Sequence, residues 1–353
     1  MTKPRALPAY LHIKSEIVRW ISSGKLRIGD PLPTRWELVE TFGTSWGTLT
    51  RAINELMNEG VLRAERGKGT FVAGEPPARG RQPESRVLKV LICQPKWTVN
   101  RSLGSFMDGI REEAHKQQYA VEYLDRAPNE YAADDLEGYI LITPTYEELP
   151  LLQERWRAGQ RFVVLGSDFP GEPFPCINAD TRNGTFQGVQ HMIRQGHTAI
   201  ALFGVQESFP NYQREIEGYR DAMYQAHLEI KPDWIVKRED DGAATVRAFE
   251  RWLEEHPECT AIFSADYTST MAILTVCERR GLSIPDDLSV VAMDELPSAE
   301  FLRTPLTSVV QPFEQLGRLA ASSFFESNKE LAITRLLPCN IHYRNSVRAL
   351  NRA

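Results

Sequence analysis

Hydrophobic residues follow helical spacing near the start of the chain. Apolar side chains recur every three or four positions over residues 10–24, 33–43 and 44–58, and each pattern stops at a glycine or a polar residue. Alternating residues over 61–74 then flank a Gly67-Lys68-Gly69 tip, which is typical of a β-hairpin. Three helices followed by a hairpin predict a winged helix-turn-helix domain.

A different pattern begins near residue 87, where short continuous apolar runs alternate with amphipathic stretches. The runs lie at 87–93, 138–142, 162–166, 198–203, 260–264 and 288–293, and the amphipathic stretches at 104–118, 181–195, 211–227, 243–256 and 268–280. Continuous apolar strands between helices predict parallel sheets that are covered on both faces. Because this part is too long for one comfortable core, we expect two α/β lobes.

Residues 75–86 separate the two patterns. They include three prolines and three arginines and almost no apolar side chain, so they cannot bury a core. We therefore expect a first domain over 1–74, an extended linker over 75–86, and a larger body over 87–353.

Composition narrows the class of protein. Hydrophobic residues make up 42% of the chain and charged residues 25%, as in globular domains. The sequence has no apolar run long enough to cross a membrane and no secretory signal pattern at its start, so we expect a cytoplasmic protein. The five cysteines are scattered without a C-x-x-C pair, so we expect neither disulfides nor a metal site, and no cofactor.

Charge is unevenly distributed along the chain. The first 75 residues carry 11 Lys and Arg against 8 Asp and Glu, whereas the whole chain carries 41 against 47. A basic first domain on an acidic body is typical of a protein that binds a polyanion through the first domain.

The first domain resembles the DNA-binding head of the GntR family. The matching motifs are LPTRWEL at 32–38, GTSWGTL at 43–49, AINELMNEGVL at 52–62 and GKGTFV at 67–72, in the order and spacing of that family. The resemblance implies that the third helix enters the major groove of double-stranded DNA and that the hairpin tip approaches the minor groove. The DNA contacts it predicts are Arg35, Ser45, Trp46, Thr48, Arg51, Arg66, Lys68 and Gly69.

Two positions depart from the family pattern. Trp46 and Thr50 stand where GntR heads usually carry arginine, so we expect an operator that differs from their commonest half-sites. The alternative is that the basic residues form the solvated face of an interaction module.

The body resembles the effector domain of LacI/GalR-type regulators, which is similar to periplasmic sugar-binding proteins. The motifs are VVLGSD at 163–168, INADTRNG at 177–184, HMIRQGHTAIA at 191–201, EGYRDAM at 217–223, TAIFSAD at 260–266, GLSIPDDLSVVAMDE at 281–295 and PLTSVVQP at 305–312. The resemblance implies an α/β body of two lobes of parallel sheets flanked by helices. It places lobe one at about 87–179 and 309–328, and lobe two at about 180–308 and 329–345.

A ligand is then expected in the cleft between the lobes, at the carboxyl ends of the strands. The predicted ligand-binding residues are Asp294, Asp266, Arg214, Ser167, Asp168, Gln94 and Trp97. Glu215 occupies the position where the family has an arginine, and Arg214 is the nearest arginine. Asp180 is expected to cap the helix that follows it.

A GntR head on a LacI-type body is similar to the arabinose-responsive repressor group. This resemblance implies a homodimeric repressor that binds a palindromic operator and is controlled by a small molecule, with a sugar favoured. The alternatives are a purine, an amino sugar or a phosphosugar as effector, or activation in place of repression. An enzyme with an aminotransferase-like body is disfavoured because the body follows the LacI pattern and lacks common catalytic motifs, and a transport protein because it would need a signal peptide and no DNA head.

Overall fold

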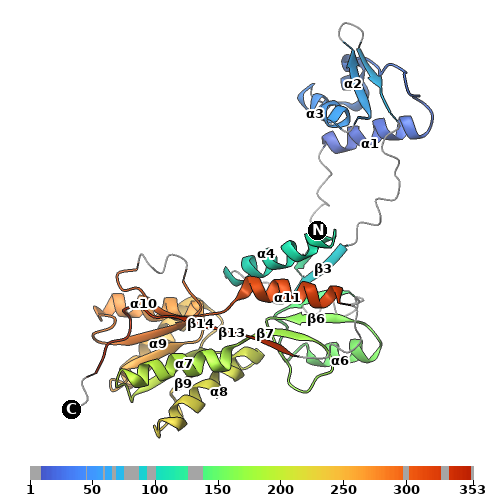
Figure 1. Ribbon diagram of the computed structural model, residues 1–353. Helices are drawn as coiled ribbons and strands as arrows, with labels where there is room; N and C mark the ends of the chain where they lie inside the picture. Colours follow the sequence, from blue (N-terminus) through green and yellow to red (C-terminus); the bar gives the residue numbers. More distant parts are fainter. Residues whose placement is uncertain are drawn as a thin grey trace. The chain divides into compact units, whose positions relative to one another are not determined.

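The computed structural model divides the chain into two compact units, Met1–Ser85 and Arg86–Ala353 (Figure 1). It describes residues 9–44, 46–58, 60–65, 69–74, 87–93, 101–125, 138–296, 302–326 and 334–350. The predicted linker at 75–86 lies outside these residues. Within them, no helix is both long enough and apolar enough to cross a membrane.

The first unit is a winged helix-turn-helix, as the hydrophobic spacing predicts. Its elements are α1 (Ala9–Ser22), α2 (Arg35–Phe42), α3 (Trp46–Asn58), β1 (Leu62–Glu65) and β2 (Gly69–Val72), and the two strands pair antiparallel. Ile17, Leu49 and Leu56 are fully buried in its core. Helix α2 begins with a capping box, because the Thr34 amide donates to the Glu37 carboxylate at 2.7 Å.

Lobe one of the second unit contains a six-stranded parallel sheet. Its strands are β3 (Val87–Ile92), β4 (Ala120–Asp125), β5 (Tyr139–Ile142), β6 (Phe162–Leu165), β7 (Cys176–Asp180) and β13 (Arg335–Pro338), in the order β13-β7-β6-β5-β3-β4. Helices α4 (Arg101–Lys116) and α11 (Phe313–Phe325) cover one face, and α6 (Leu149–Arg157) packs on the other. Ile140 points to the first face and Leu141 to the second, which explains the continuous apolar runs.

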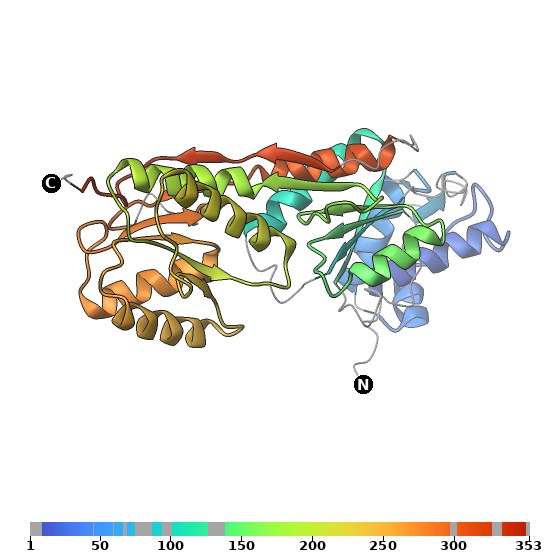
Figure 2. The same cartoon turned by 90° about the horizontal axis from the view of Figure 1, so that it is seen from below.

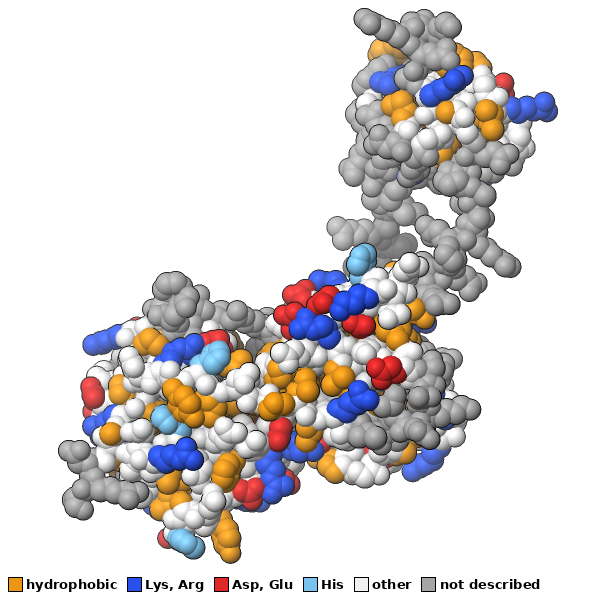
Figure 3. Space-filling view, in the orientation of Figure 1, with side chains coloured by type: hydrophobic (Ala, Val, Ile, Leu, Met, Phe, Trp, Pro, Cys, Tyr) orange, Lys and Arg blue, Asp and Glu red, His pale blue; other side chains and the backbone are white. Residues whose placement is uncertain are grey.

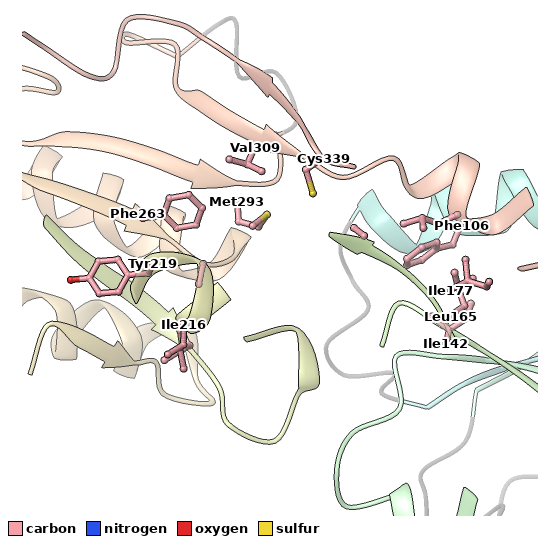
Figure 4. Close-up of a cluster of buried hydrophobic side chains, with 14 of the residues drawn as sticks. Phe106, Ile142, Leu165, Ile177, Ile216, Tyr219, Phe263, Met293, Val309 and Cys339 are labelled. Atoms are coloured by element: carbon pink, nitrogen blue, oxygen red, sulfur yellow. The ribbon is translucent and has the colours of Figure 1, made fainter. Parts of the chain in front are cut away.

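Lobe two repeats this architecture. Its strands are β8 (Ile200–Val205), β9 (Ile235–Lys237), β10 (Ala261–Ser264), β11 (Ser289–Met293), β12 (Thr307–Val310) and β14 (Asn340–His342), in the order β14-β12-β11-β10-β8-β9. Only β14 runs antiparallel to its neighbour. Helices α7 (Thr181–Arg194) and α8 (Pro210–Gln225) cover one face, and α9 (Gly242–Glu255) and α10 (Tyr267–Arg280) the other. Figure 4 shows buried side chains of the two lobes as separate groups, with Phe106 and Ile142 in one and Tyr219 and Phe263 in the other.

The second crossing between the lobes lies close to the predicted position, whereas the third lies later in the chain than the sequence predicts. We expected 309–328 in lobe one and 329–345 in lobe two. Instead, Val309 and Val310 pair with β14 in the lobe-two sheet, whereas Arg335–Pro338 pairs with β7 in the lobe-one sheet. The second crossing therefore follows β12 and the third lies between β13 and β14, where the chain runs directly from one lobe to the other (Figure 2). Edge strands this short give little hydrophobic signal from which to assign them.

Helices α4 and α11 approach each other at two glycines. A Cβ atom added to Gly109 would lie 2.0 Å from the carbonyl oxygen of Glu314, and one added to Gly317 would lie 2.3 Å from that of Phe106. The exposed side of the pair carries ion pairs such as Arg318–Glu112 at 2.6 Å, and Figure 3 shows acidic and basic side chains interspersed there. Exposed ion pairs contribute at most about 1 kcal/mol each. We therefore attribute the position of the two helices mainly to the close contact between their backbones at Gly109 and Gly317.

We expect Gly109→Ala to lower the free energy of unfolding by about 1–3 kcal/mol, because the added methyl group would overlap the backbone of α11. Gly104→Ala on the same helix is the matched control, since its Cβ would meet no atom within 4 Å. The control should be neutral, or stabilising by up to about 1 kcal/mol. Urea unfolding of both variants measures the difference, and equal stability would contradict the packing argument.

Candidate ligand-binding cavity

A cavity of about 140 Å³ lies between the two lobes of the second unit. Its lining includes the aromatic rings of Phe106, Phe209, Tyr212 and Phe313 and the carboxylates of Glu215, Asp266 and Asp294. Most of the lining follows the carboxyl ends of strands, with Gly166 after β6, Asp266 after β10 and Asp294 after β11. Parallel strands bring such positions to one edge of each sheet, and the two edges face each other across the cavity.

Asp266 has two roles in the structure. One carboxylate oxygen accepts the Ser269 amide at 2.7 Å and so caps α10. The other oxygen accepts the Tyr212 hydroxyl at 2.9 Å and forms an ion pair with Arg238 at 2.5 Å. The capping role and the cavity role are therefore compatible in one side chain.

Asp294 stands at a sharp turn immediately after β11. Its φ of 66° lies in the left-handed region, which aspartate adopts more readily than most residues, and its amide donates to the Val309 carbonyl at 2.8 Å. The Gln311 side-chain amide donates to the carboxylate at 3.1 Å. Burial raises the pKa of this carboxyl to about 7, against the opposing effect of the Gln311 hydrogen bond and with a further increase from Asp266.

Glu215 reaches the cavity from α8, one helical turn beyond Tyr212 on the same face. The residue is only 3% exposed, and its Oε2 atom has no hydrogen-bond partner among the described residues. Burial raises the pKa of its carboxyl well above the usual value, and the nearby Asp294 and Asp266 raise it further. An unpartnered buried carboxyl is costly, and it marks a place where a ligand group can supply the missing partner.

Three of the predicted ligand residues lie outside the cavity lining. Asp168 at the end of β6 is fully buried and pairs with Arg214 on α8, so the two residues join the lobes to each other. The Asn178 amide donates to Asp168 at 2.7 Å and to the Asn211 side-chain oxygen at 2.6 Å. Ser167 donates its hydroxyl to the Pro144 carbonyl at 2.8 Å. Asp168, Arg214 and Ser167 are thus all bonded to other groups of the protein.

The remaining sequence predictions have mixed outcomes. Asp266 and Asp294 are brought together in the lining, whereas Gln94 and Trp97 lie outside the described residues. Asp180 caps α7 as expected, by accepting the Asn183 amide at 3.1 Å. The lining residues that sequence reasoning missed as site residues include Glu215, Tyr212, Arg238, Gln311 and Phe313. The helical spacing of 212 and 215 was an available signal, but Arg238 follows a three-residue strand and offered none.

Family comparisons match the two units separately. Residues 9–72 match the model of bacterial regulatory proteins of the gntR family, and residues 189–347 match the model of a periplasmic binding protein-like domain. The chain is a transcription regulator with a GntR-type head and a periplasmic binding protein-like body. Its DNA-binding and effector-binding domains make it a ligand-controlled regulator.

Relatives of this regulator match most of its length. It is 24% identical over 351 residues to the arabinose metabolism transcriptional repressor of Geobacillus stearothermophilus, covering 95% of each chain. It is 25% identical over 328 residues to the HTH-type transcriptional repressor CytR of Escherichia coli K12, covering 87% of this chain and 94% of that one. A structure of the transcriptional regulator CelR with cellobiose matches with a TM-score of 0.66 and 20% identity, over 89% of this chain and all of the other, and supports the fold.

The structure places part of the predicted DNA-contact set in the head of the regulator. Arg35 is the first residue of α2, Trp46 is the first residue of α3, Thr48 is half-buried in its first turn, and Gly69 begins β2 with a φ of 123°. Arg51 lies within α3, while Ser45, Arg66 and Lys68 lie outside the described residues, as do the side chains of Trp46 and Arg51. Thr50 is half-buried and its hydroxyl is enclosed, so its side chain packs within the head.

We expect Arg214→Met to lower the free energy of unfolding by about 3 kcal/mol, because it leaves the Asp168 carboxylate buried without its cation. Arg182→Met is the matched control, since Arg182 pairs with the exposed Asp221 at 2.8 Å and its loss should cost less than about 1 kcal/mol. Urea unfolding compares the two. The double variant Asp168→Asn/Arg214→Met should recover part of the loss, and a loss equal to the sum of the single changes would contradict the pairing.

Proposed function

We propose that this regulator is a cytoplasmic homodimeric repressor that leaves a palindromic operator when a carbohydrate occupies the cavity. The observation that carries the proposal is a cavity between two lobes whose lining combines aromatic rings with the carboxylates of Glu215, Asp266 and Asp294. Carboxylates accept hydrogen bonds from several hydroxyl groups, and aromatic faces pack against the C–H surface of a sugar ring. The names of its relatives, which include an arabinose metabolism repressor, support the same class of effector.

The position of the cavity between the lobes explains how a bound effector could change the affinity for DNA. Phe106 and Gly166 belong to lobe one, whereas Asp266 and Asp294 belong to lobe two, so a bound ligand favours one arrangement of the lobes. A ligand changes operator affinity only if it binds the DNA-competent arrangement and the other arrangement with different strength. We propose that the effector favours the arrangement with lower operator affinity. In this account the cavity binds its ligand without transforming it.

On the DNA side we propose the contacts that the GntR resemblance predicts. Helix α3 enters the major groove, with Ser45, Trp46, Thr48 and Arg51 at or near its amino-terminal end, and Arg35 contacts DNA from the start of α2. The tip of the hairpin, with Arg66, Lys68 and Gly69, approaches the minor groove. Two heads related by a two-fold axis match a palindrome with half-sites about one helical turn apart.

The effector proposal predicts that Asp294→Asn and Asp266→Asn each weaken sugar binding by about 10-fold or more, because each removes a charged hydrogen-bond acceptor. A panel of pentoses and hexoses is first screened by thermal shift on the full chain, and operator release by the sugars that bind is followed by fluorescence anisotropy. Asp221→Asn, exposed on the outer side of α8, is the control and should behave as wild type. Operator binding that tightens or stays unchanged with every sugar that binds would overturn the repressor scheme.

The DNA proposal predicts that Arg35→Ala and Lys68→Ala weaken operator binding and reduce the slope of log affinity against log salt by about 1 for each lost phosphate contact. Lys231→Ala, an exposed body lysine paired with Glu258, is the control. Fluorescence anisotropy on operator DNA selected from genomic fragments measures both quantities. Unchanged affinity and salt slope in both head variants would exclude these contacts.

A further inference from the structure

The polar groups that line the cavity are unevenly matched. Its amide and phenol donors are already directed at acceptors within the protein: Asn211 donates to the Gly166 carbonyl at 2.9 Å, Tyr212 to Asp266 at 2.9 Å and Gln311 to Asp294 at 3.1 Å. Gln206 donates to Asp240 at 3.3 Å. The buried Oε2 atom of Glu215, in contrast, has no partner among the described residues. The cavity therefore offers a surplus of acceptors.

The charges in the cavity are unbalanced in the same direction. The Arg238 guanidinium pairs with Asp266 and donates to the Gln206 side-chain oxygen at 2.9 Å and to the Glu239 carbonyl at 3.1 Å. Within the part of the chain that the structure describes, neither Glu215 nor Asp294 forms an ion pair. Two carboxyl groups thus face a cavity whose one lining guanidinium is already shared among three other oxygen acceptors.

We propose that the effector carries a positively charged amino group, held by the carboxylates of Glu215 and Asp294, so that its class is an amino sugar. The inference rests on the proposed carbohydrate effector and specifies its chemistry. An ammonium group has three donors and no acceptor, which matches a site with three carboxyl groups, one guanidinium, and amide and phenol donors that are already engaged within the protein. A neutral hydroxyl has one donor and no charge, so it matches the two carboxyl groups less fully than an ammonium group does, and an anionic group would be repelled by them.

Proton uptake gives this site a measurable signature. Burial raises the pKa of Glu215 well above its usual value and brings that of Asp294 to about 7, so the Asp294 carboxyl is partly protonated in the unliganded protein near neutral pH. An ammonium group favours the ionised carboxylates and therefore displaces protons when it binds. The other titratable groups that face the pair are Asp266 before α10, Arg238 after β9, Tyr212 on α8 and Cys339 between β13 and β14. Affinity for an amino sugar should accordingly fall as the pH is lowered below 7.

Calorimetric titration of the full chain tests the inference with matched ligand pairs. Each pair consists of a hexose and the corresponding sugar with one hydroxyl replaced by an amine at carbon 2, 3, 4 or 6, measured at pH 7.0 and 5.5. For at least one pair we expect the amino sugar to bind about 10-fold more tightly than its parent, equal to about 1.4 kcal/mol, with affinity that weakens at pH 5.5. Titration in buffers of different ionisation enthalpy should show protons released on binding.

Glu215→Gln keeps the shape of the side chain and removes its charge, so it should lower the amino-sugar preference to less than about threefold. Asp294→Asn gives a second variant with the same expectation, and Glu217→Gln, exposed on the outer side of α8, should keep the wild-type preference. A parent hexose that binds as tightly as every amino counterpart would overturn the inference and leave the proposed function standing. Absence of binding by all sugars, amino and neutral, would overturn both.

Discussion

The buried ion pair between Asp168 and Arg214 is the contact on which the cavity depends. It joins the end of β6 in lobe one to α8 in lobe two, and the cost of burying the two charges is offset by their pairing and by the Asn178 amide. The network continues through Asn211, whose amide donates to the carbonyl of Gly166. Both Asn211 and Gly166 also line the cavity. The same contacts therefore hold the lobes together and shape the walls between which a ligand binds.

Helix α8 connects this network to the chemistry of the site. It carries Arg214 toward Asp168 and Glu215 toward the cavity, so two adjacent residues face different surroundings. The helix lies close to α7 because Gly218 has no side chain, and a Cβ there would lie 2.1 Å from the Arg182 carbonyl oxygen. A helix held by backbone contact fixes the positions of its side chains closely. Helix α8 therefore holds the carboxyl group of Glu215 in a fixed position.

A site of this kind lowers the stability of the unliganded protein and, in return, allows the protein to respond to its ligand. Glu215 is buried and the neighbouring Asp294 half-buried, and both have raised pKa values, which means that their ionised forms are disfavoured until a partner arrives. Because the partner must reach walls from both lobes, its binding energy depends on how the lobes are arranged. This dependence is what a ligand-controlled regulator requires of its effector domain.

The sequence by itself determined the head, the parallel sheets and the two aspartates of the cavity, because these follow from local patterns. Hydrophobic period reveals helices and buried strands, and Asp266 and Asp294 stand where strands end, at an edge that parallel topology brings together. Only the tertiary structure decided the partner of Arg214, the roles of Arg238 and Gln311, and the lobe to which β12 and β13 belong. These features join residues far apart in the chain, and burial, which sets the state of Glu215, exists only after the lobes have packed.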